Sequence, residues 1–261
     1  MTSINPGSEN HILGLKSLLD QKVKEINVEG FIHDDPISIP KQYSIKQDVE
    51  ITAFWVSMLA WGQRVTIINK ANQLFELMGN EPYKFILEHK ESDRKRFSEF
   101  KHRTFQYTDT LYFLEFLQRY YKNHESLEEL FSDHPNIKSA LIHFHESFFS
   151  LENAPQRTRK HVATPARNST CKRLNMFLRW MVRKDQNGVD FGIWKKIPTG
   201  QLMIPLDVHV ERVARTLGIL KRKQRDWKAV EELTSALRLL DHQDPVKYDY
   251  ALYGMGVLGE L

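Results

Sequence analysis

The sequence predicts an all-α protein, and three observations support this. Apolar residues recur three and four positions apart along most of the chain, which is the period of a helix packed on one face. Residues that start or stop helices bound these segments, as Pro82 and Gly218 do. No segment alternates apolar and polar residues for the length of a strand, so no sheet is expected.

In chain order, we expect helices over residues 12–23, 51–61, 67–78, 82 onward, 111–117, 126–131, 137–149, 172–183, 208–217, 226–240 and 245–255. Polar residues that accept hydrogen bonds from free backbone amides mark several starts. Asp48 is expected to cap the second helix, and Thr108 or Asp109 the fifth. Glycine, which adopts positive φ without strain, is expected to end the second helix at Gly62 and the ninth at Gly218.

We expect one unit over residues 1–261, built from two interlocked helical subdomains with a cleft between them. The first covers approximately residues 40–160 and the second approximately residues 161–225, with 1–39 and 226–261 packing on the second. The polar, basic stretch 151–170 lies at the boundary.

The composition fits a folded protein with a polyanionic partner. Hydrophobic residues make up 41% of the chain, which is enough for a substantial core. The formal net charge is +4, and basic residues gather at 94–96, 157–160 and 221–225. Such clusters are either solvated surfaces or contacts to a polyanion.

The single cysteine, Cys171, excludes an intramolecular disulfide and an iron–sulfur cluster held by four thiolates. The polar residues 1–10 do not resemble a signal peptide, and the apolar run 51–61 is too short to span a bilayer and is typical of a buried helix. We therefore expect a cytoplasmic protein with no membrane contact, no cofactor and no bound metal.

Two side chains carry the predicted chemistry. Lys172 lies at the start of an amphipathic helix, where the helix dipole and partial burial both disfavour an ammonium ion. Such a lysine can act as an amine nucleophile and form a Schiff base with a sugar carbon. Asp207 precedes another helix, and an ionised carboxylate there would assist the lysine or stabilise developing positive charge.

Each of these residues also has a purely structural interpretation. Asp207 could serve only as a helix cap, worth about 1 kcal/mol. Lys172 could be a solvated lysine, and His209, in the first turn after Asp207, could be a structural hydrogen-bond donor. Six aromatic residues could line a base-binding pocket or belong to the core: Trp55, Trp61, Trp180, Trp194, Tyr250 and Tyr253.

The whole motif favours the catalytic interpretation. The segment Ile204–Gly218 contains Leu-Asp-Val-His-Val-Glu-Arg-Val, which resembles the catalytic-aspartate segment of the helix-hairpin-helix DNA glycosylases. Lys-Arg-Leu-Asn-Met-Phe-Leu, at 172–178, resembles the helix after the hairpin in the bifunctional members, where lysine is the nucleophile. Leu-Ala-Trp-Gly-Gln, at 59–63, is similar to the segment that holds a polar wedge, which makes Gln63 the candidate. This resemblance is specific for about residues 165–220.

The chain also resembles, over nearly its full length, an uncharacterised bacterial family known only as a domain of unknown function. The stretch Lys-Arg-Leu-Asn-Met-Phe-Leu-Arg-Trp-Met and the stretch Asp-Pro-Val-Lys-Tyr-Asp-Tyr-Ala, ending at Ala251, are the close match.

Two features depart from the glycosylase pattern. The hairpin at 164–171 has no glycine, so Arg167, Ser169 and Thr170 would have to bind the DNA phosphate, with His209 as a further DNA contact. Lys172 and Asp207 are 35 residues apart, and the extra length lies in residues 184–203. This spacing is closest to that of the archaeal 8-oxoguanine glycosylases.

The resemblance implies a helix-hairpin-helix glycosylase fold and a base-excision repair glycosylase with lyase activity, acting on duplex DNA with a damaged or abasic site. It also implies a nucleoid-associated monomer. The base would be flipped out of the stack, and Lys172 would attack the sugar. Oxidised guanine is favoured by analogy, while another lesion and RNA stay open. The alternatives are a monofunctional glycosylase in which Asp207 activates water, a non-catalytic DNA-binding protein, and a helical protein with no nucleic-acid role.

Overall fold

The computed structural model describes residues 7–260, and within this range the protein is all-α. No strand occurs there, and the isolated bridge between His102 and Phe105 is the only β-type pairing in the range. The helices are α1 (Glu9–Gly14), α2 (Lys16–Ile26), α3 (Glu29–Ile32), α4 (Lys46–Leu59), α5 (Arg64–Glu76), α6 (Pro82–Glu88), α7 (Tyr107–Tyr121), α8 (Ile137–Phe148), α9 (Lys172–Val182), α10 (Val208–Thr216), α11 (Trp227–Leu240) and α12 (Tyr248–Leu258). The predicted all-α class is confirmed.

Several predicted helix ends are wrong in detail. Helix α4 begins at Lys46, so Asp48 lies in its first turn and accepts a hydrogen bond from the amide of Tyr83 (2.7 Å) instead of capping α4. Helix α4 also ends before Gly62, at Leu59. The expected helix over 126–131 is a 3-10 turn, Leu127–Leu130.

The start of α7 also differs from the prediction, because Gln106 is the cap of this helix. Asp109 takes the third helical position and accepts a hydrogen bond from the amide of Gln106 (2.8 Å). Asp109 therefore does contribute to the start of α7, but as its third residue and not as its cap.

Helix α4 is buried along most of its length. Every residue from Asp48 to Leu59 is buried, because the helix is covered on all sides and not on one face only. This agrees with the expectation of a buried helix. None of the helices in the described range is long and apolar enough to cross a membrane.

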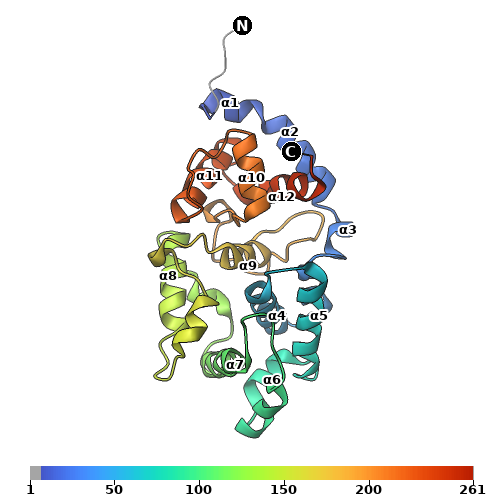
Figure 1. Cartoon of the computed structure of the whole chain (residues 1–261), viewed down its shortest axis with the longest axis vertical. Helices are drawn as coiled ribbons and strands as arrows, with labels where there is room; N and C mark the ends of the chain where they lie inside the picture. Colours follow the sequence, from blue (N-terminus) through green and yellow to red (C-terminus); the bar gives the residue numbers. More distant parts are fainter. Residues whose placement is uncertain (1–6, 261) are drawn as a thin grey trace. The chain divides into compact units, whose positions relative to one another are not determined.

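The chain folds as two compact units. The first, unit 1, comprises residues 1–31, 136–138 and 164–261. Helix α12 packs against α2 and α10, and α1 packs against α11 (Figure 1). The N-terminal helices and the C-terminal helices therefore pack together in one unit. Its core includes Trp180, Trp194, Trp227 and Tyr250, which are at most 1% exposed.

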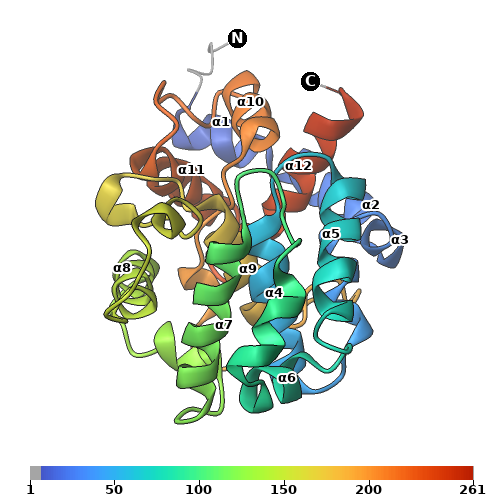
Figure 2. The same ribbon diagram turned by 60° about the horizontal axis from the view of Figure 1, so that its bottom comes forward.

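The second, unit 2, comprises residues 32–135 and 139–163. Helix α4 packs against α5 and α6, and α6 packs against α7, as Figure 2 shows. The core is rich in aromatic rings: Phe54 stacks on Phe113 with centroids 5.6 Å apart, and Trp55 lies 4.8 Å from the same ring. These contacts fix the direction of α4 and hence the position of the loop that follows it.

Candidate active site

Lys172 is the first residue of α9, as the sequence predicts. Cys171 before it has a left-handed backbone, with φ of 49°, and turns the chain into the helix. The side chain of Lys172 is half-buried, and its Nζ lies 3.6 Å from Sδ of Met176, one helical turn further on. The amine therefore lies along the first turn of α9, where the helix dipole disfavours its protonated form.

Asp207 is the cap of α10, also as predicted. Its Oδ1 accepts hydrogen bonds from the amides of His209 (2.9 Å) and Val210 (3.0 Å). The side chain is half-buried. One carboxylate oxygen is therefore fixed by the helix, and the helix N-terminus favours negative charge on the group.

A third ionisable group, which the sequence reasoning missed, links these two residues. Asp249, on the first turn of α12, is 6% exposed and accepts a hydrogen bond from the guanidinium of Arg179 on α9. Burial raises the pKa of Asp249 to about 7; Arg179 opposes the rise, the charge of Asp207 adds to it, and the charge of Lys172 opposes it. Lys172 and Asp207 thus act on the same buried carboxyl group.

In the sequence, Asp249 stood out only as part of the Asp-Pro-Val-Lys-Tyr-Asp-Tyr-Ala stretch that the chain shares with the uncharacterised family. That stretch did not indicate a chemical role for the carboxylate. A single carboxylate in a helical pattern is usually solvated. Only the packing of α12 shows that this one is buried and paired.

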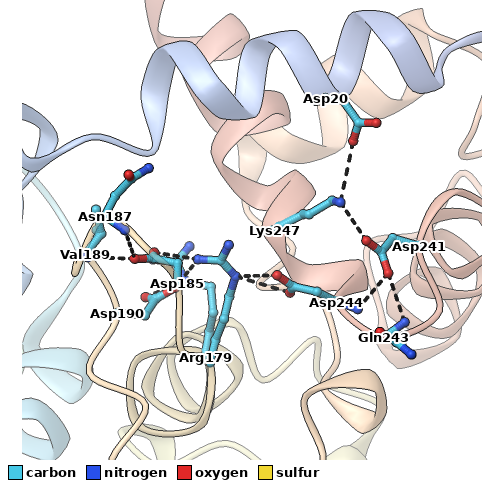
Figure 3. A network of polar contacts seen from close by, with 11 residues as sticks. Asp20, Arg179, Asp185, Asn187, Val189, Asp190, Asp241, Gln243, Asp244 and Lys247 are labelled. Atoms are coloured by element: carbon cyan, nitrogen blue, oxygen red, sulfur yellow. Dashed lines mark hydrogen bonds and ion pairs between the residues drawn. The ribbon is translucent and has the colours of Figure 1, made fainter.

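The site is supported by a buried ion network (Figure 3). Arg179 donates to Asp190 (3.2 Å), and Arg183, one turn further along α9, donates to Asp190 (2.9 Å) and Asp244 (2.9 Å). Both guanidinium groups lie over the ring of Tyr250, at 4.4 Å and 5.4 Å from its centroid. The network fixes the face of α9 that begins at Lys172.

The network also explains what the long segment between Lys172 and Asp207 does. Residues 184–203 contain no α-helix, yet Asp190 and Trp194 within them are buried. Asp190 binds both arginines of α9, and the amide of Trp194 donates to the carbonyl of Met181 (2.9 Å). The insertion therefore packs against α9 and contributes a carboxylate to its charged face.

The hairpin at 164–171 forms its turn without glycine. Asn168 takes the left-handed conformation, with φ of 58°, and its side chain donates to Asp226 (3.0 Å) at the start of α11. The hydroxyl of Ser169 accepts a hydrogen bond from the amide of Cys171 (3.3 Å), while Thr170 is half-buried. Arg167 is exposed and is the one charged side chain of the hairpin.

The two remaining predicted site residues, His209 and Gln63, belong to different units. His209 in unit 1 is half-buried, and its ring meets the edge of Tyr253 with centroids 5.8 Å apart. Gln63 in unit 2 is the exposed residue before α5, and its side chain makes no capping hydrogen bond.

The predicted aromatic pocket walls are largely core residues. Trp55, Trp180, Trp194 and Tyr250 are at most 1% exposed, so they do not line an open pocket. Trp61 and Tyr253 are half-buried and keep one part of the ring near solvent. A surface hollow of about 710 Å³ lies on α1 and α2, lined by residues such as Leu13, Lys16 and Lys24, and contains neither Lys172 nor Asp207.

The three basic clusters are partly neutralised within the protein. Arg96 pairs with Asp93 (3.1 Å), and Arg94 lies 3.8 Å from Glu115. Arg157 pairs with Asp109, Arg222 with Asp226 (2.5 Å), and Arg225 with Glu211 (3.4 Å). Clustering of basic residues in the sequence therefore overstates the charge available to a polyanion.

Comparison with known proteins identifies the family. Residues 35–258 match the model of a family described as "Protein of unknown function (DUF2400)". No curated protein matches the chain, and no solved structure matches it. The match covers all of the chain from the segment before α4 to the last turn of α12, including Lys172, Asp207 and Asp249, so the chain belongs to the DUF2400 family.

Proposed function

We propose that the protein is a DNA glycosylase of base-excision repair with associated lyase activity, on a helix-hairpin-helix glycosylase fold. One observation carries the proposal: the charges of Lys172 and Asp207, 35 residues apart in the sequence, act on the same buried carboxyl group of Asp249. An amine and a carboxylate at the starts of two helices thus both influence one buried carboxyl group, and a lysine with a carboxylate near it suits Schiff-base chemistry at a sugar.

The reaction would begin with Lys172 as a neutral amine. Its nitrogen attacks the anomeric carbon of the deoxyribose, the glycosidic bond breaks, and the base leaves with the electron pair of that bond and takes up a proton. The attached nitrogen then loses one proton. Its electron pair opens the sugar ring, so that the bond between the anomeric carbon and the ring oxygen breaks, the ring oxygen takes up a proton and a protonated imine forms. Loss of a proton from the neighbouring carbon then expels the 3′ phosphate and cuts the strand.

The surroundings of each group suit its role in this sequence. Lys172 is half-buried at a helix N-terminus, which favours the neutral amine, and its Nζ lies 3.6 Å from the sulfur of Met176. Asp207 keeps Oδ2 available while Oδ1 is fixed by two amides. A carboxylate held in this way can stabilise the positive charge that develops on the sugar as the base departs.

The test is trapping of the imine with sodium borohydride on duplex oligonucleotides that contain an abasic site, 8-oxoguanine or no lesion. The wild type and Lys16→Gln should form a covalent adduct on a lesion, and Lys172→Gln should form none. Lys16 is a matched control because it is the first residue of α2 in the same unit.

An adduct formed equally by Lys172→Gln would contradict the assigned nucleophile. Base release by the wild type without an adduct would favour the monofunctional enzyme in which Asp207 activates water. Salt-dependent DNA binding with neither product would favour a non-catalytic binding protein.

A further inference from the structure

Unit 2 presents a short loop held by an aromatic stack. The loop joins α4 to α5 and contains Trp61 and Gln63; residues 60–63 are named here the Gln63 loop. The indole of Trp61 stacks on the imidazoles of His102 and His161, with centroids 5.8 Å and 5.1 Å apart and the planes within 25° of parallel. His102 also contacts the carbonyl oxygen of Trp61 through Nε2 (3.1 Å). The loop is therefore fixed through its tryptophan.

The stack is anchored deep in the unit. His161 is completely buried, and its Nε2 lies 3.4 Å from Oδ2 of Asp109. Asp109 also accepts a hydrogen bond from Thr158 (2.7 Å). Although burial raises it, His161, the hydroxyl of Thr158 and the amide of Gln106 together hold the pKa of Asp109 below its ordinary value. Asp109 therefore lies against His161, the ring on which Trp61 stacks.

A second element adjoins the loop. Residues 102–105, named here the Arg103 turn, are closed by two hydrogen bonds of 2.9 Å between the backbones of His102 and Phe105. Arg103 has φ of 54°, a left-handed conformation that is uncommon for a residue with a side chain. A residue held in such a conformation marks a turn whose shape is imposed by its surroundings.

The two elements touch at Gly62. Its φ is 101°, and a Cβ at this position would lie 2.8 Å from Nη1 of Arg103. The missing side chain therefore leaves the space that the guanidinium occupies. The Gln63 loop and the Arg103 turn form one continuous surface, which is called here the two-loop surface.

Two polar side chains on this surface have no partner of their own. Gln63 and Arg103 are both exposed, and no carboxylate among the described residues pairs with Arg103. Arg96 and Arg119 of the same unit differ, since they are paired with Asp93 (3.1 Å) and Glu115 (2.9 Å).

The local field on this surface is positive. Burial lowers the pKa of His102, and the charges of Arg103 and Lys70 lower it further against the opposing effect of two backbone carbonyls. Lys70 itself donates a hydrogen bond to Gln73 (2.8 Å). An exposed guanidinium that pairs with no carboxylate among the described residues suits a phosphate.

We propose that the two-loop surface contacts a nucleic-acid strand, with Arg103 binding a backbone phosphate and the Trp61 stack holding Gln63 ready to enter the base stack. This inference rests on the proposed function and extends it to Arg103, which the sequence did not assign, and to Trp61, which was expected only as a pocket wall or a core residue. Trp61 acts through Gln63 and is therefore a positioning residue, while Arg103 contacts the strand directly.

The experiment measures binding to a duplex with an abasic site and 2-aminopurine next to it. Fluorescence anisotropy gives the dissociation constant at several salt concentrations, and 2-aminopurine emission reports entry of a side chain into the stack. Arg103→Gln should weaken binding severalfold and reduce the slope of log Kd against log salt by about 0.9, the value for one phosphate. Arg103→Lys should restore most of that slope.

Trp61→Ala should abolish the 2-aminopurine response while leaving the salt slope unchanged, and Trp61→Phe, which keeps a flat ring, should restore part of the response. Arg119→Gln is the matched control, because it lies 12 residues along α7 from Tyr107, or about 18 Å away along the helix. Thermal melting checks that each variant is folded.

The inference is overturned if Arg103→Gln and Arg119→Gln bind alike, or if folded Trp61→Ala keeps the full 2-aminopurine response. Its failure is distinct from that of the proposed function. A wild type that forms the borohydride adduct but binds independently of Arg103 and Trp61 loses only the inference. A wild type whose binding depends on Arg103 and whose Trp61 variants change 2-aminopurine emission, but which forms no adduct, keeps the inference and loses the lyase.

Discussion

The guanidinium of Arg179 donates to the carboxylate of Asp249, and this contact joins α9 to α12 within unit 1. Helix α9 begins with Lys172, and α12 packs against α10, which begins after Asp207. The pair therefore links α9 to α12, which packs in turn against the helix that Asp207 caps. Substitutions around it separate the structural and chemical roles of these charges.

Asp207→Asn and Asp207→Ala should separate helix capping from chemistry. Asparagine caps helices about as well as aspartate, so Asp207→Asn should unfold near the wild-type denaturant midpoint but lose nearly all imine trapping. Asp207→Ala removes the acceptor for the amides of His209 and Val210 and should lose about 1 kcal/mol as well. Urea unfolding and trapping measure the two effects. Full activity of Asp207→Asn would show that the carboxylate is only a cap.

Asp249→Asn should change how stability depends on pH. Because burial raises the pKa of Asp249 to about 7, the folded state holds a proton that the unfolded state releases. The proton on Asp249 therefore stabilises the folded state fully below about pH 4, which is the pKa of an aspartate in the unfolded chain. This stabilisation is lost as the pH rises to about 7. Urea unfolding from pH 4 to 8 should show a smaller fall in stability for Asp249→Asn than for the wild type.

The control for this prediction is Asp241→Asn. Asp241 has a lowered pKa: burial raises it, but Lys247 and two backbone amides outweigh that effect. Its contribution is present above the unfolded pKa and lost below it, so its removal should leave the slope between about pH 4 and 7 unchanged. Equal slopes for the wild type and Asp249→Asn would show that Asp249 is ionised throughout this range.

Arg183→Gln should destabilise unit 1 strongly. Arg183 is 4% exposed and pairs with Asp185 (2.8 Å), Asp190 (2.9 Å) and Asp244 (2.9 Å). Removing one member of a buried ion network leaves the others uncompensated, at a cost of about 3–5 kcal/mol. Arg215→Gln, which breaks a more exposed pair with Glu211, should cost much less in the same urea experiment. Similar losses for the two variants would refute a buried network.

Gly62→Ala should affect both stability and DNA binding, while Gly79→Ala should affect stability alone. Both glycines have positive φ, 101° and 71°, so alanine should cost about 1–2 kcal/mol at each. Only at Gly62 would the new methyl group meet Arg103, whereas nothing lies within 4 Å at Gly79. Thermal melting and anisotropy should separate the variants. Wild-type affinity in Gly62→Ala would show that Arg103 does not need its present position.

The sequence by itself determined the helical class and most of the helices. Helical periodicity and end signals are local, so α9, α10 and α11 begin at or next to the residues expected for them. The same locality placed Lys172 at a helix start and Asp207 at a cap. The errors lie at Asp48 and Asp109, where contacts with Tyr83 and with Arg157, Thr158 and His161 decide the role of the carboxylate.

Only the tertiary structure decided which charges meet. Asp249, Asp190 and Arg183 look like ordinary polar residues in the sequence, and their burial depends on how α9, α12 and residues 184–203 pack. The same is true of Trp61, whose stacking partners are 41 and 100 residues away. Contacts between residues so far apart in the sequence form because many residues pack together. A local sequence pattern therefore cannot predict them.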